Sequence, residues 1–334
     1  MPCIVTVGGF FGDEGKGKIV AYLAKKDNLS IAARGGVGPN AGHTFVHQGR
    51  TYKVRMLPSA VLNKPTRLLV GAGVLVNPQI LLNEIELFDS INRTFIDSQC
   101  GIIEKSHLEM DSSEDHLKSK IGTTGSGTGP ANADRSYRTL KLAKHLPILD
   151  NYIRNISDLV NSDLDSNQNV LIEGTQGTFL SLYHGSYPYV TSKDVTASAI
   201  CSDVGIGPKR VNEVIVVFKA YVTRVGEGPL QQEINSKEAE KRGWLEYGSV
   251  TGRKRRVSPF DLTLAKKAVR LNSATQIALT KLDVAFPNCA GIKEFSKLSD
   301  NSKKFIQDIE SETGLEVSLI GTGAEIDDII DRRR

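Results

Sequence analysis

Short apolar runs rich in β-branched residues recur along the chain, and polar or glycine-containing segments separate them. They fall at residues 4–7, 67–70, 169–172, 213–218, 276–280 and 316–320. Runs of this kind are typical of strands that are buried on both faces, as in a parallel sheet. We therefore expect these segments to form the strands of one sheet.

Segments with a helix-like pattern lie between the predicted strands. They are residues 19–25, 78–88, 140–160, 259–271 and 303–312. Alternating strands and helices predict an α/β fold with a central, mostly parallel sheet flanked by helices. Residues 44–55 alternate around Gln48-Gly49, which predicts a small hairpin inserted at an edge of this fold.

Several connections are long, polar and rich in glycine: residues 35–43, 118–138, 183–195 and 225–258. Loops of this length are usually functional or disordered. These loops contain Arg, His, Thr and Gly rather than low-complexity repeats, which favours function. Since no internal repeat or linker divides the sequence, we predict a single domain over residues 1–334 with long active-site loops.

Composition narrows the class of protein. Of 334 residues 40% are apolar, which suffices for a sizeable core. The 42 Lys and Arg against 38 Asp and Glu give a net charge of +4, too small an excess to indicate nucleic-acid binding. The four cysteines have no CxxC spacing, so neither a zinc site nor a disulfide framework is indicated. Without a signal-like or membrane-length apolar segment, we predict a cytoplasmic protein with no membrane partner.

The sequence GGFFGDEGKGK at residues 8–18 follows the first predicted strand and leads into a predicted helix. The backbone N–H groups of such a loop, together with Lys16, suit a nucleotide phosphate. The spacing is unlike GxxxxGK[ST], because Gly9 to Gly15 is one residue too long and Gly17 stands where the magnesium-binding hydroxyl belongs. Asp13 is the nearest hard oxygen donor for a magnesium ion. The alternative is a glycine-rich turn with solvent-facing charges.

The segment TKLD at residues 280–283 ends another predicted strand. In [NT]KxD loops the lysine stem packs on the purine and the aspartate accepts from guanine N1–H and N2–H₂. Adenine has no such donor pair and would leave a desolvated carboxylate unpaired. A guanine site is therefore predicted, and the alternative is a polar pair that caps a strand. The GTG turn at 321–323 is a weaker signal for guanine or ribose contacts, or a simple turn.

Two glycine-containing loops have the composition of a reaction site. GPNAGHT at 38–44 offers an imidazole that exchanges protons near neutral pH, and with Asp13 it supplies a separate acid and base. The alternative for His43 is a structural role. Residues 122–130 alternate glycine with hydroxyl side chains, and Arg135 and Arg138 follow, which predicts a second phosphate or nucleotide site rather than a flexible linker.

The run TGRKRR at residues 251–256 concentrates four positive charges. Nucleic-acid binding or a localisation signal is the usual interpretation of such a run. Interleaved aromatic residues and a broad basic field do not accompany it, so a small dicarboxylate bound by Arg253 and Arg255 fits as well.

Nearly the whole chain resembles the adenylosuccinate synthetase family. The resemblance rests on segments in the family's order: GGFFGDEGKGK, GPNAGHT, IGTTGSGTGP, EGTQGTFL, HGSYPYVTS, AYVTRVGEGP, VTGRKRR, LTKLD and GTG. It implies a P-loop-NTPase-like fold and a GTP-dependent ligase that joins L-aspartate to IMP with Mg²⁺. The products would be adenylosuccinate, GDP and phosphate, formed through a 6-phosphoryl-IMP intermediate in AMP biosynthesis.

The resemblance also implies catalytic roles. Asp13 would take the N1 proton of IMP so that O6 attacks the γ-phosphate, His43 would act as general acid, and Lys16 would lie along the phosphates. Asp13 and the carbonyl of Gly42 would bind magnesium. Arg138 would reach the IMP phosphate bound by a partner subunit, which implies a homodimer. We expect no nucleic-acid partner.

The ligand contacts implied by the family fall on the same segments. GTP would be bound by Gly12, Asp13, Glu14, Gly15, Lys16, Gly17, Gly42, His43, Thr44, Lys281, Asp283, Gly321, Thr322 and Gly323. IMP would be bound by Asp13, Asn40, Ala41, Gly42, His43, Thr123, Thr124, Arg138, Gln176, Thr191, Val225 and Arg255. L-Aspartate would be bound by Val250, Thr251, Gly252, Arg253 and Arg255.

This sequence departs from the family pattern in a few places. The chain is shorter than common bacterial members and resembles the compact archaeal form. Gly321 stands where a serine is often found, and Ser126 replaces a basic residue. The compact form also resembles viral relatives that join aspartate to dGMP, but those commonly lack the loop aspartate, so Asp13 favours IMP. A regulatory GTPase, the remaining alternative, predicts Ser or Thr after the loop lysine.

Overall fold

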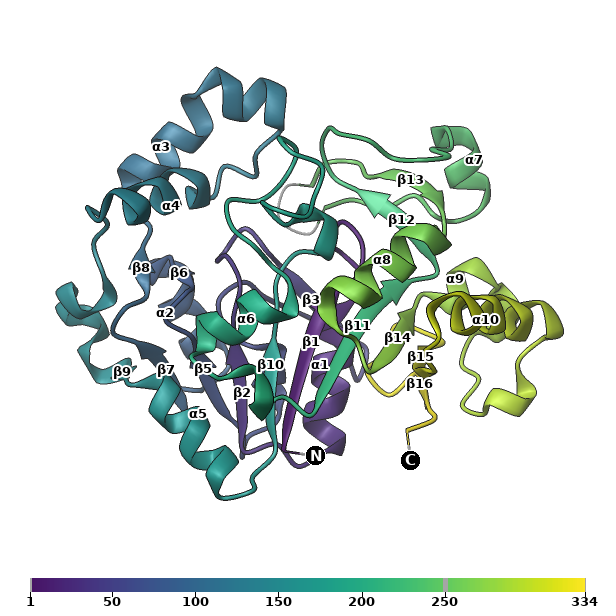
Figure 1. Cartoon of the computed structure of the whole chain (residues 1–334), viewed down its shortest axis with the longest axis horizontal. Helices are drawn as coiled ribbons and strands as arrows, with labels where there is room; N and C mark the ends of the chain where they lie inside the picture. Colours follow the sequence, from purple (N-terminus) through teal and green to yellow (C-terminus); the bar gives the residue numbers. More distant parts are fainter. Residues whose placement is uncertain (1, 249–251, 334) are drawn as a thin grey trace.

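The computed structural model describes residues 2–248 and 252–333. Its centre is a ten-stranded sheet whose neighbouring strands are parallel except at one edge, where β15 and β16 are antiparallel (Figure 1). In spatial order the strands are β16 (Ile329–Asp331), β15 (Val317–Gly321), β14 (Gln276–Thr280), β11 (Glu213–Lys219), β1 (Cys3–Gly8), β10 (Val170–Glu173), β2 (Ile31–Arg34), β5 (Arg67–Val70), β7 (Thr94–Asp97) and β9 (Ile153–Arg154). The predicted α/β fold with a mostly parallel sheet is confirmed.

The central strands are buried on both faces because two separate cores cover the sheet. In β1, Val5 and Val7 belong to one core and Ile4 to the other, and in β10 Ile172 and Leu171 divide in the same way. Successive side chains of a strand point to opposite faces. A continuous apolar run is therefore what a strand between two layers requires.

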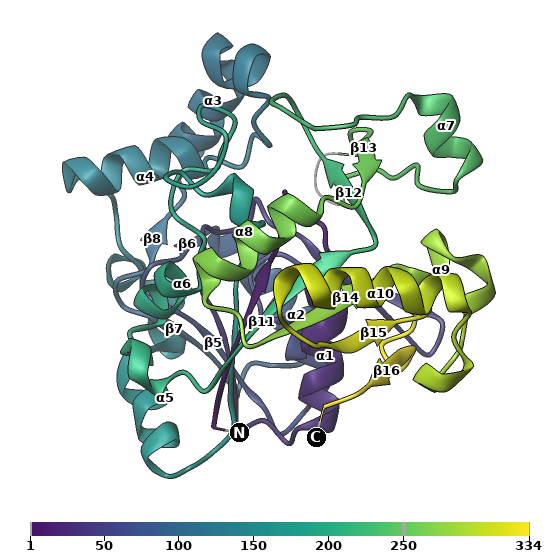
Figure 2. The same ribbon diagram turned by 45° about the vertical axis from the view of Figure 1, so that its right-hand side comes forward.

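Helices form those two layers. The core that contains Val5 takes its helical side chains from α5 (Ile156–Asp165), α6 (Ala197–Val204), α8 (Leu262–Asn272) and α10 (Asp300–Thr313). The opposite core takes them from α1 (Lys16–Lys26) and α2 (Pro78–Leu87). Figures 1 and 2 show α8 and α10 together on one side of the strands.

Two arms stand beyond the carboxyl ends of the central strands (Figures 1 and 2). One arm contains α3 (Lys105–Ser113) and α4 (Thr128–Tyr137). The other contains α7 (Ser236–Lys241) and the antiparallel pair β12 (Tyr221–Arg224) and β13 (Arg256–Pro259). Ligands of open α/β sheets bind outside the carboxyl ends of the strands, so the arms flank the expected site.

The predicted hairpin is confirmed as β3 (His43–His47) and β4 (Arg50–Val54). Gln48 has φ 53° and Gly49 has φ 73°, as a tight two-residue hairpin turn requires. The remaining elements are short: β6 (Leu75–Val76) pairs with β8 (Gly101–Ile102), α9 covers Leu282–Ala285, and His116–Ile121 is a π-helix. Short 3-10 helices cover Ser59–Leu62, Ala143–His145, Pro147–Tyr152, Thr178–Leu180, Pro208–Arg210, Pro287–Cys289 and Phe295–Lys297.

The helix predicted over 140–160 is wrong for most of its length. The segment forms two 3-10 turns and β9, and only its end belongs to α5. Pro147 begins the second 3-10 turn, and the Asn155 side chain accepts from Asp158 N at 3.2 Å, which caps a new helix. The helix predicted from residue 259 begins at Leu262, because the preceding residues pair as β13 and Asp261 caps α8.

Two of the long loops contain regular structure that the sequence did not predict. Residues 118–138 include α4, and residues 225–258 include α7 and β13. All four cysteines are buried as free thiols, as expected. Within the described ranges, no helix is long and apolar enough to span a membrane. The single-domain assignment stays a prediction.

Candidate active site

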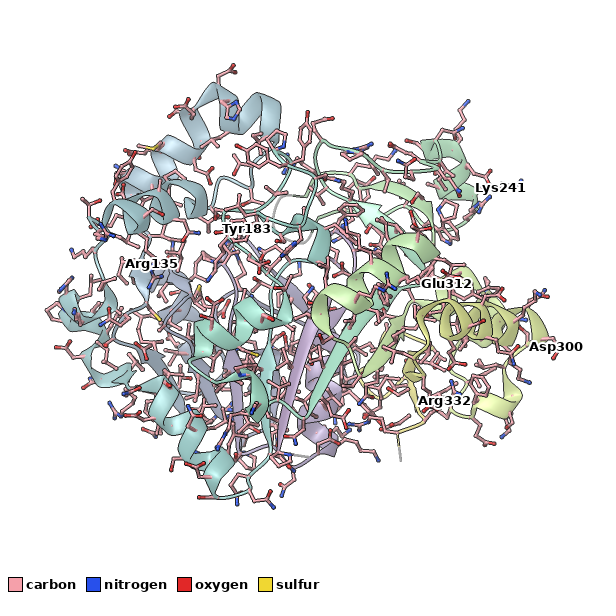
Figure 3. All side chains as sticks on the ribbon, in the orientation of Figure 1. Arg135, Tyr183, Lys241, Asp300, Glu312 and Arg332 are labelled. Atoms are coloured by element: carbon pink, nitrogen blue, oxygen red, sulfur yellow. The ribbon has the colours of Figure 1, made fainter. Side chains whose placement is uncertain are left out.

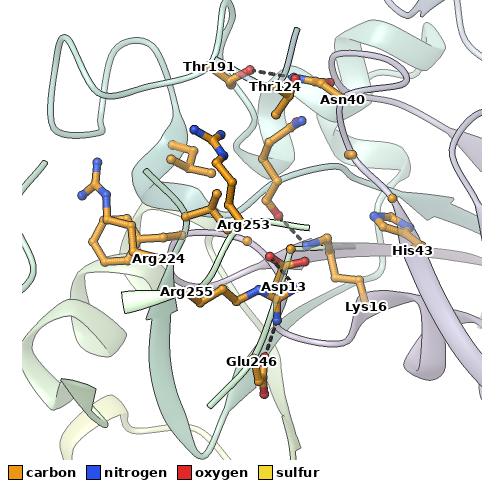
Figure 4. Close-up of a pocket in the computed structure, with 18 of the residues that line it drawn as sticks. Asp13, Lys16, Asn40, His43, Thr124, Thr191, Arg224, Glu246, Arg253 and Arg255 are labelled. Carbon is orange, nitrogen blue, oxygen red and sulfur yellow. Dashed lines mark hydrogen bonds and ion pairs between the residues drawn. The ribbon is translucent and has the colours of Figure 1, made fainter. Parts of the chain in front are cut away.

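A pocket of about 880 Å³ is lined by residues at the carboxyl ends of the central strands and by residues of both arms, such as Asp111 and Tyr247. Figure 4 shows part of this lining. Most site residues expected from the sequence line the pocket. They are Gly12, Asp13, Gly15, Lys16, Gly17, Asn40, Ala41, Gly42, His43, Thr44, Thr123, Thr124, Gln176, Thr191, Val225, Arg253, Arg255, Lys281, Asp283 and Gly323. The fold therefore brings together residues from the first fifth and the last fifth of the chain.

The glycine loop is folded around the buried carboxylate of Glu14. One oxygen of Glu14 accepts from the backbone N–H groups of Phe10 at 3.0 Å and Gly12 at 2.8 Å. The other oxygen lies 3.0 Å from Lys16 Nζ, which also donates to the backbone carbonyl of Gln176. A Cβ on Gly8 would overlap this cluster, so the strand must end in glycine here. Glu14 thus shapes the loop from beneath and does not line the pocket.

Asp13 sits in the loop with φ 62°, a left-handed conformation that projects its carboxylate into the pocket. Arg255 Nη2 lies 2.9 Å from Asp13 Oδ2 (Figure 4). Burial raises the pKa of Asp13 above its ordinary value, while Arg255 and Lys219 act in the opposite direction. An aspartate of this kind is a better proton acceptor than an exposed one.

The imidazole of His43 is buried in a charged cluster. Its Nδ1 contacts the carboxylate of Glu173, which also accepts from Ser59 N and Oγ, both at 2.6 Å. Burial raises the pKa of Glu173, but His43 and Arg34 outweigh this effect and hold the pKa at about 2. The ionised Glu173 therefore accepts a hydrogen bond from Nδ1–H of His43, which fixes the tautomer.

His43 is neutral in this arrangement, because burial and the nearby Arg34 guanidinium lower its pKa to about 4. Arg34 itself is fully buried and donates to the Ala41 carbonyl at 2.9 Å. Nε2 of His43 is buried and has no hydrogen-bond partner within the described part of the chain. A polar ligand atom is the natural partner for this nitrogen.

The side chains expected to bind IMP converge on one wall. Asn40 Nδ2 lies 3.4 Å from Thr191 Oγ1, and Thr124 lies beside this pair in Figure 4. Oδ1 of Asn40 and both amide atoms of Gln176 are buried without a hydrogen-bond partner among the described residues. Buried amides left in this state point to a polar ligand on this wall.

The loop at 122–127 is held from both arms. Asp111 on α3 accepts from Thr123 Oγ1 and from Gly127 N, both at 2.7 Å. From the opposite arm, Arg253 Nη2 donates to the Gly122 carbonyl at 2.7 Å and the Thr123 carbonyl at 3.2 Å. Arg253 therefore links the expected aspartate-binding run to the expected IMP-binding loop.

The TKLD segment is joined directly to the glycine loop. Thr280 Oγ1 donates to the backbone carbonyl of Glu14 at 2.6 Å. Lys281 has φ 61° and directly precedes the short helix α9, and both Lys281 and Asp283 line the pocket. Oδ1 of Asp283 is buried and lacks a hydrogen-bond partner in residues 2–248 and 252–333. Asp283, which the sequence predicts to bind guanine, is thus buried with an oxygen that can accept a hydrogen bond from a ligand.

Several expected residues lie elsewhere. Gly321 and Thr322 are not in the pocket lining, and Thr322 Oγ1 donates to the Ile292 carbonyl at 2.8 Å. Gly252 is exposed outside the lining, and Val250 and Thr251 fall outside the described residues. Arg138 is exposed at the end of α4 and does not line this pocket.

Comparison with known proteins decides the family. A sequence model of adenylosuccinate synthetase matches residues 5–146 and 139–287. Adenylosuccinate synthetase of Methanocaldococcus jannaschii is 55% identical over 336 residues, covering 100% of this chain and 97% of that protein. The enzyme of Methanococcus vannielii is 53% identical over 336 residues, covering 100% and 99%. This chain belongs to the adenylosuccinate synthetase family.

Solved structures agree with this assignment. The fully ligated adenylosuccinate synthetase from Plasmodium falciparum superposes with a TM-score of 0.90 at 27% identity, covering 99% of each chain. Cyanophage S-2L succinoaminodeoxyadenylate synthetase, bound to dGMP and dATP, shares the fold with a TM-score of 0.83 at 24% identity, covering 100% of this chain and 96% of that one. The activity of the family is GTP-dependent ligation of L-aspartate to IMP in purine biosynthesis, a C–N bond-forming reaction.

In this member of the adenylosuccinate synthetase family, the sequence did not reveal several residues that contact and orient the predicted site residues. Glu173, Lys18 and Glu246 each bind a predicted site residue, and Arg224 donates to the Tyr189 carbonyl at 2.9 Å to hold the 183–195 loop. Glu173 was signalled by its place at the end of a strand, in EGTQG. The others make contacts that no local pattern reveals.

Lys18 is the clearest of these missed residues. Its Nζ donates to the carbonyls of Gly323 at 2.7 Å and Asp328 at 2.8 Å, which ties α1 to the turn in the same pocket wall as Asp283. Burial lowers the pKa of Lys18 to about 8, although Asp328 and Asp283 oppose the shift. Lys18 thus holds the turn rather than a phosphate.

We expect Lys18→Met to raise the KM for GTP by about 10-fold to 100-fold, because hydrogen bonds from a charged group contribute about 1.5–3 kcal/mol. The KM values for IMP and L-aspartate should change by less than about threefold. Lys25→Met, on the same helix, removes only the exposed ion pair with Asp327 and is the control. Steady-state kinetics for each substrate measure the difference, and equal rises in all three KM values would contradict the assignment.

Proposed function

We propose that this pocket performs the ligation in two steps around Asp13. Asp13 takes the proton from N1 of IMP, and the electrons of that bond make O6 the nucleophile. O6 attacks the γ-phosphorus of GTP, and the bond to the bridging oxygen breaks to release GDP. The amine of L-aspartate then attacks C6, and the C6–O bond breaks to release phosphate.

The observation that carries this proposal is the 2.9 Å contact between Asp13 and Arg255. It joins the phosphate loop to the run expected to bind the L-aspartate carboxylate. A single site can then hold the γ-phosphate, the purine ring and the incoming amine within reach of one another, as ligation requires. A regulatory GTPase has no need of this junction.

The phosphates of GTP are proposed to lie along the glycine loop. Lys16 contacts Glu14 and the Gln176 carbonyl. It lines the pocket together with the loop residues Gly12, Gly15 and Gly17. His43 would donate to a phosphate oxygen through Nε2. Since the pKa of His43 is lowered to about 4 by burial, the phosphate's own negative charge has to raise it before the imidazole acts as an acid.

Magnesium is proposed to be held by Asp13 and the Gly42 carbonyl, which line the same pocket. Among the described residues, no group of three or more His, Cys, Asp or Glu side chains could hold a metal ion. This donor set fits Mg²⁺, which is usually bound through one or two protein oxygens together with substrate phosphates and water. The ion would neutralise charge on the transferred phosphoryl group.

The other wall is proposed to recognise IMP and L-aspartate. Asn40, Gln176 and Thr191 would supply polar contacts to IMP, since their amide atoms include several that are buried without partners in the described ranges. The aspartate carboxylates would bind Arg253 and Arg255, whose planar guanidinium groups match carboxylates. Asp283 would accept from guanine.

A homodimer is proposed from the position of Arg138. Its exposure outside the main pocket is what a residue that completes a neighbouring subunit's site requires. Close by, a smaller hollow of about 390 Å³ is lined by residues that include Arg135 and Tyr183, which lie on one side of the molecule in Figure 3. Tyr137 and Tyr183 are 78% and 74% exposed, and large exposed aromatic side chains are enriched at interfaces.

Product analysis tests the reaction itself. With Mg²⁺, GTP and L-aspartate, we expect IMP to give adenylosuccinate, and dGMP to react at least about 10²-fold more slowly. Mass spectrometry of the products and a coupled GDP assay distinguish the outcomes. An aspartate adduct of dGMP but none of IMP would favour the viral type of reaction, and GTP hydrolysis with no adduct would favour a GTPase.

Asp13→Asn tests the proposed base. Turnover should fall by about 10²-fold to 10⁴-fold, because a positioned base contributes about that much. Binding of IMP, measured by calorimetry, should persist. Asp283→Asn provides a matched control, since it should raise the KM for GTP while leaving kcat at saturating GTP near normal. Near-normal kcat in Asp13→Asn would remove Asp13 from the mechanism.

Mixing two inactive variants tests the shared site. In a symmetric dimer, a heterodimer of Arg138→Ala and Asp13→Asn has one complete site and one doubly damaged site. After random exchange of subunits, we expect recovery of about one quarter of wild-type activity. Each variant kept alone is the control. Activity that never exceeds the sum of the two variants, with exchange confirmed by native mass spectrometry, would contradict the proposal.

A further inference from the structure

Glu246 lies directly behind Arg255 and contacts it with a carboxylate that three donors share. Its Oε2 accepts from Lys219 Nζ at 2.9 Å and from Arg255 Nη1, and its Oε1 accepts from the Tyr221 hydroxyl. Figure 4 shows Glu246 on the side of Arg255 away from the pocket wall of Asn40 and Thr191. Every part of this carboxylate therefore faces a donor from the protein itself.

The backbone fixes Glu246 opposite Arg255. Arg255 N donates to the Glu246 carbonyl at 2.9 Å, and Gly248 N donates to the Arg253 carbonyl at 2.8 Å. Tyr247 and Lys254 form an isolated antiparallel bridge between these two contacts. Neighbours across antiparallel segments place their side chains close together. The Glu246 to Arg255 contact is thus built into the local fold.

The anchor of this pair is deeply buried. Lys219, at the carboxyl end of β11, is 2% exposed, Arg255 is 8% exposed and Glu246 is 15% exposed. Lys219 Nζ also donates to Thr223 Oγ1 at 2.6 Å and lies 4.8 Å from the centre of the Tyr221 ring. Burying these charges is unfavourable unless they are paired and hydrogen-bonded. The pairing is complete only with Glu246 present.

Four charges alternate in sign from the sheet to the pocket: Lys219, Glu246, Arg255 and Asp13. The guanidinium of Arg255 forms an ion pair with Glu246 through Nη1 and with Asp13 through Nη2. Its Nε is buried and has no hydrogen-bond partner in the described part of the chain. The flexible arginine side chain is therefore oriented before any ligand arrives, which reduces the entropy lost on binding.

We infer that Glu246 is a positioning residue that aims the Arg255 guanidinium at the carboxylate of the L-aspartate substrate, with Lys219 as its buried anchor. This inference rests on the proposed function, because it needs L-aspartate to be the ligand of Arg255. Without the carboxylate, Lys219 and Arg255 become two neighbouring buried cations with Asp13 as their nearest anion. Arg255 would then turn toward Asp13 and away from the substrate.

A neighbouring ion pair provides a control. It distinguishes a residue that orients Arg255 from one that only stabilises the fold of the arm. Arg256 pairs with Glu233 through Nε at 2.9 Å, in the same arm and one residue further along the chain. Glu233 is 37% exposed, and the pair does not line the pocket. Glu233→Gln therefore removes an arginine's carboxylate partner in this arm without touching Asp13.

The test compares Glu246→Gln with Glu233→Gln in the full-length protein. In Glu246→Gln the new amide group faces donors that need an acceptor, so we expect kcat/KM for L-aspartate to fall about 10²-fold, the effect of misplacing a substrate-binding group by about 1 Å. The KM for GTP should stay within about threefold, because the Asp283 end of the pocket is untouched. Glu233→Gln should leave both quantities within about twofold.

Glu246→Asp keeps the negative charge. Its kcat/KM for L-aspartate should be at least about tenfold higher than that of Glu246→Gln. Recovery of this kind supports an electrostatic, positioning role. An unchanged kcat/KM for L-aspartate in Glu246→Gln would overturn the inference. Parallel losses for GTP and L-aspartate together with a lowered melting temperature would also overturn it, since they would mean support of the arm alone.

The wild-type product assay separates this test from the proposed function. If the wild-type protein forms no adenylosuccinate, the proposed function fails whatever Glu246 does. If the wild-type protein forms adenylosuccinate and Glu246→Gln behaves like Glu233→Gln, the proposed function stands and only the role of Glu246 is lost.

Discussion

Parallel strand pairing at the centre of the sheet is the constraint on which the site depends. The register pairs Thr6 of β1 with Glu173 of β10, Gly8 of β1 with Val217 of β11, and Lys219 of β11 with Thr280 of β14. The carboxyl ends of these four strands therefore lie at the same edge of the sheet, each within two residues of its neighbour's end, and each strand ends in a polar or glycine residue that leads into a segment lining the pocket. A one-residue slip would move these ends relative to one another and exchange the faces of their side chains.

The charges at this edge are paired with one another. Asp13 pairs with Arg255, Lys16 with Glu14, and Glu173 with Arg34 at 3.9 Å. Buried charges are tolerated only when they are paired in this way. A substrate must therefore replace a protein partner with one of its own, and anions of the wrong shape would leave a buried charge unpaired. Selectivity of this kind comes from the protein's own ion pairs as much as from direct contacts to the substrate.

The sequence predicted six of the ten strands of the central sheet, because burial on both faces leaves continuous apolar runs. It missed β2, β7, β9 and β16, which have only two to four residues each and leave too short a pattern. It also predicted the residues that line the pocket, since short motifs such as GDEGKGK and TKLD specify backbone shape and chemistry together. The helix over 140–160 failed because Pro147 and the Asn155 cap outweighed a loosely apolar pattern. Glu246 and Lys18 were missed because their partners are chosen by the tertiary fold, and a single sequence contains no signal for such pairs.

The contact between Lys18 and the Gly323 carbonyl joins positions 305 residues apart. The phosphate loop and α1 are translated well before the turn beside Asp283. The loop-closure entropy of such a contact is lost before its energy is gained, so it forms late. A growing chain on the ribosome consequently contains the phosphate loop before Lys18 can hold the turn beside Asp283, so this end of the pocket is assembled only after Gly323 and Asp328 have been added.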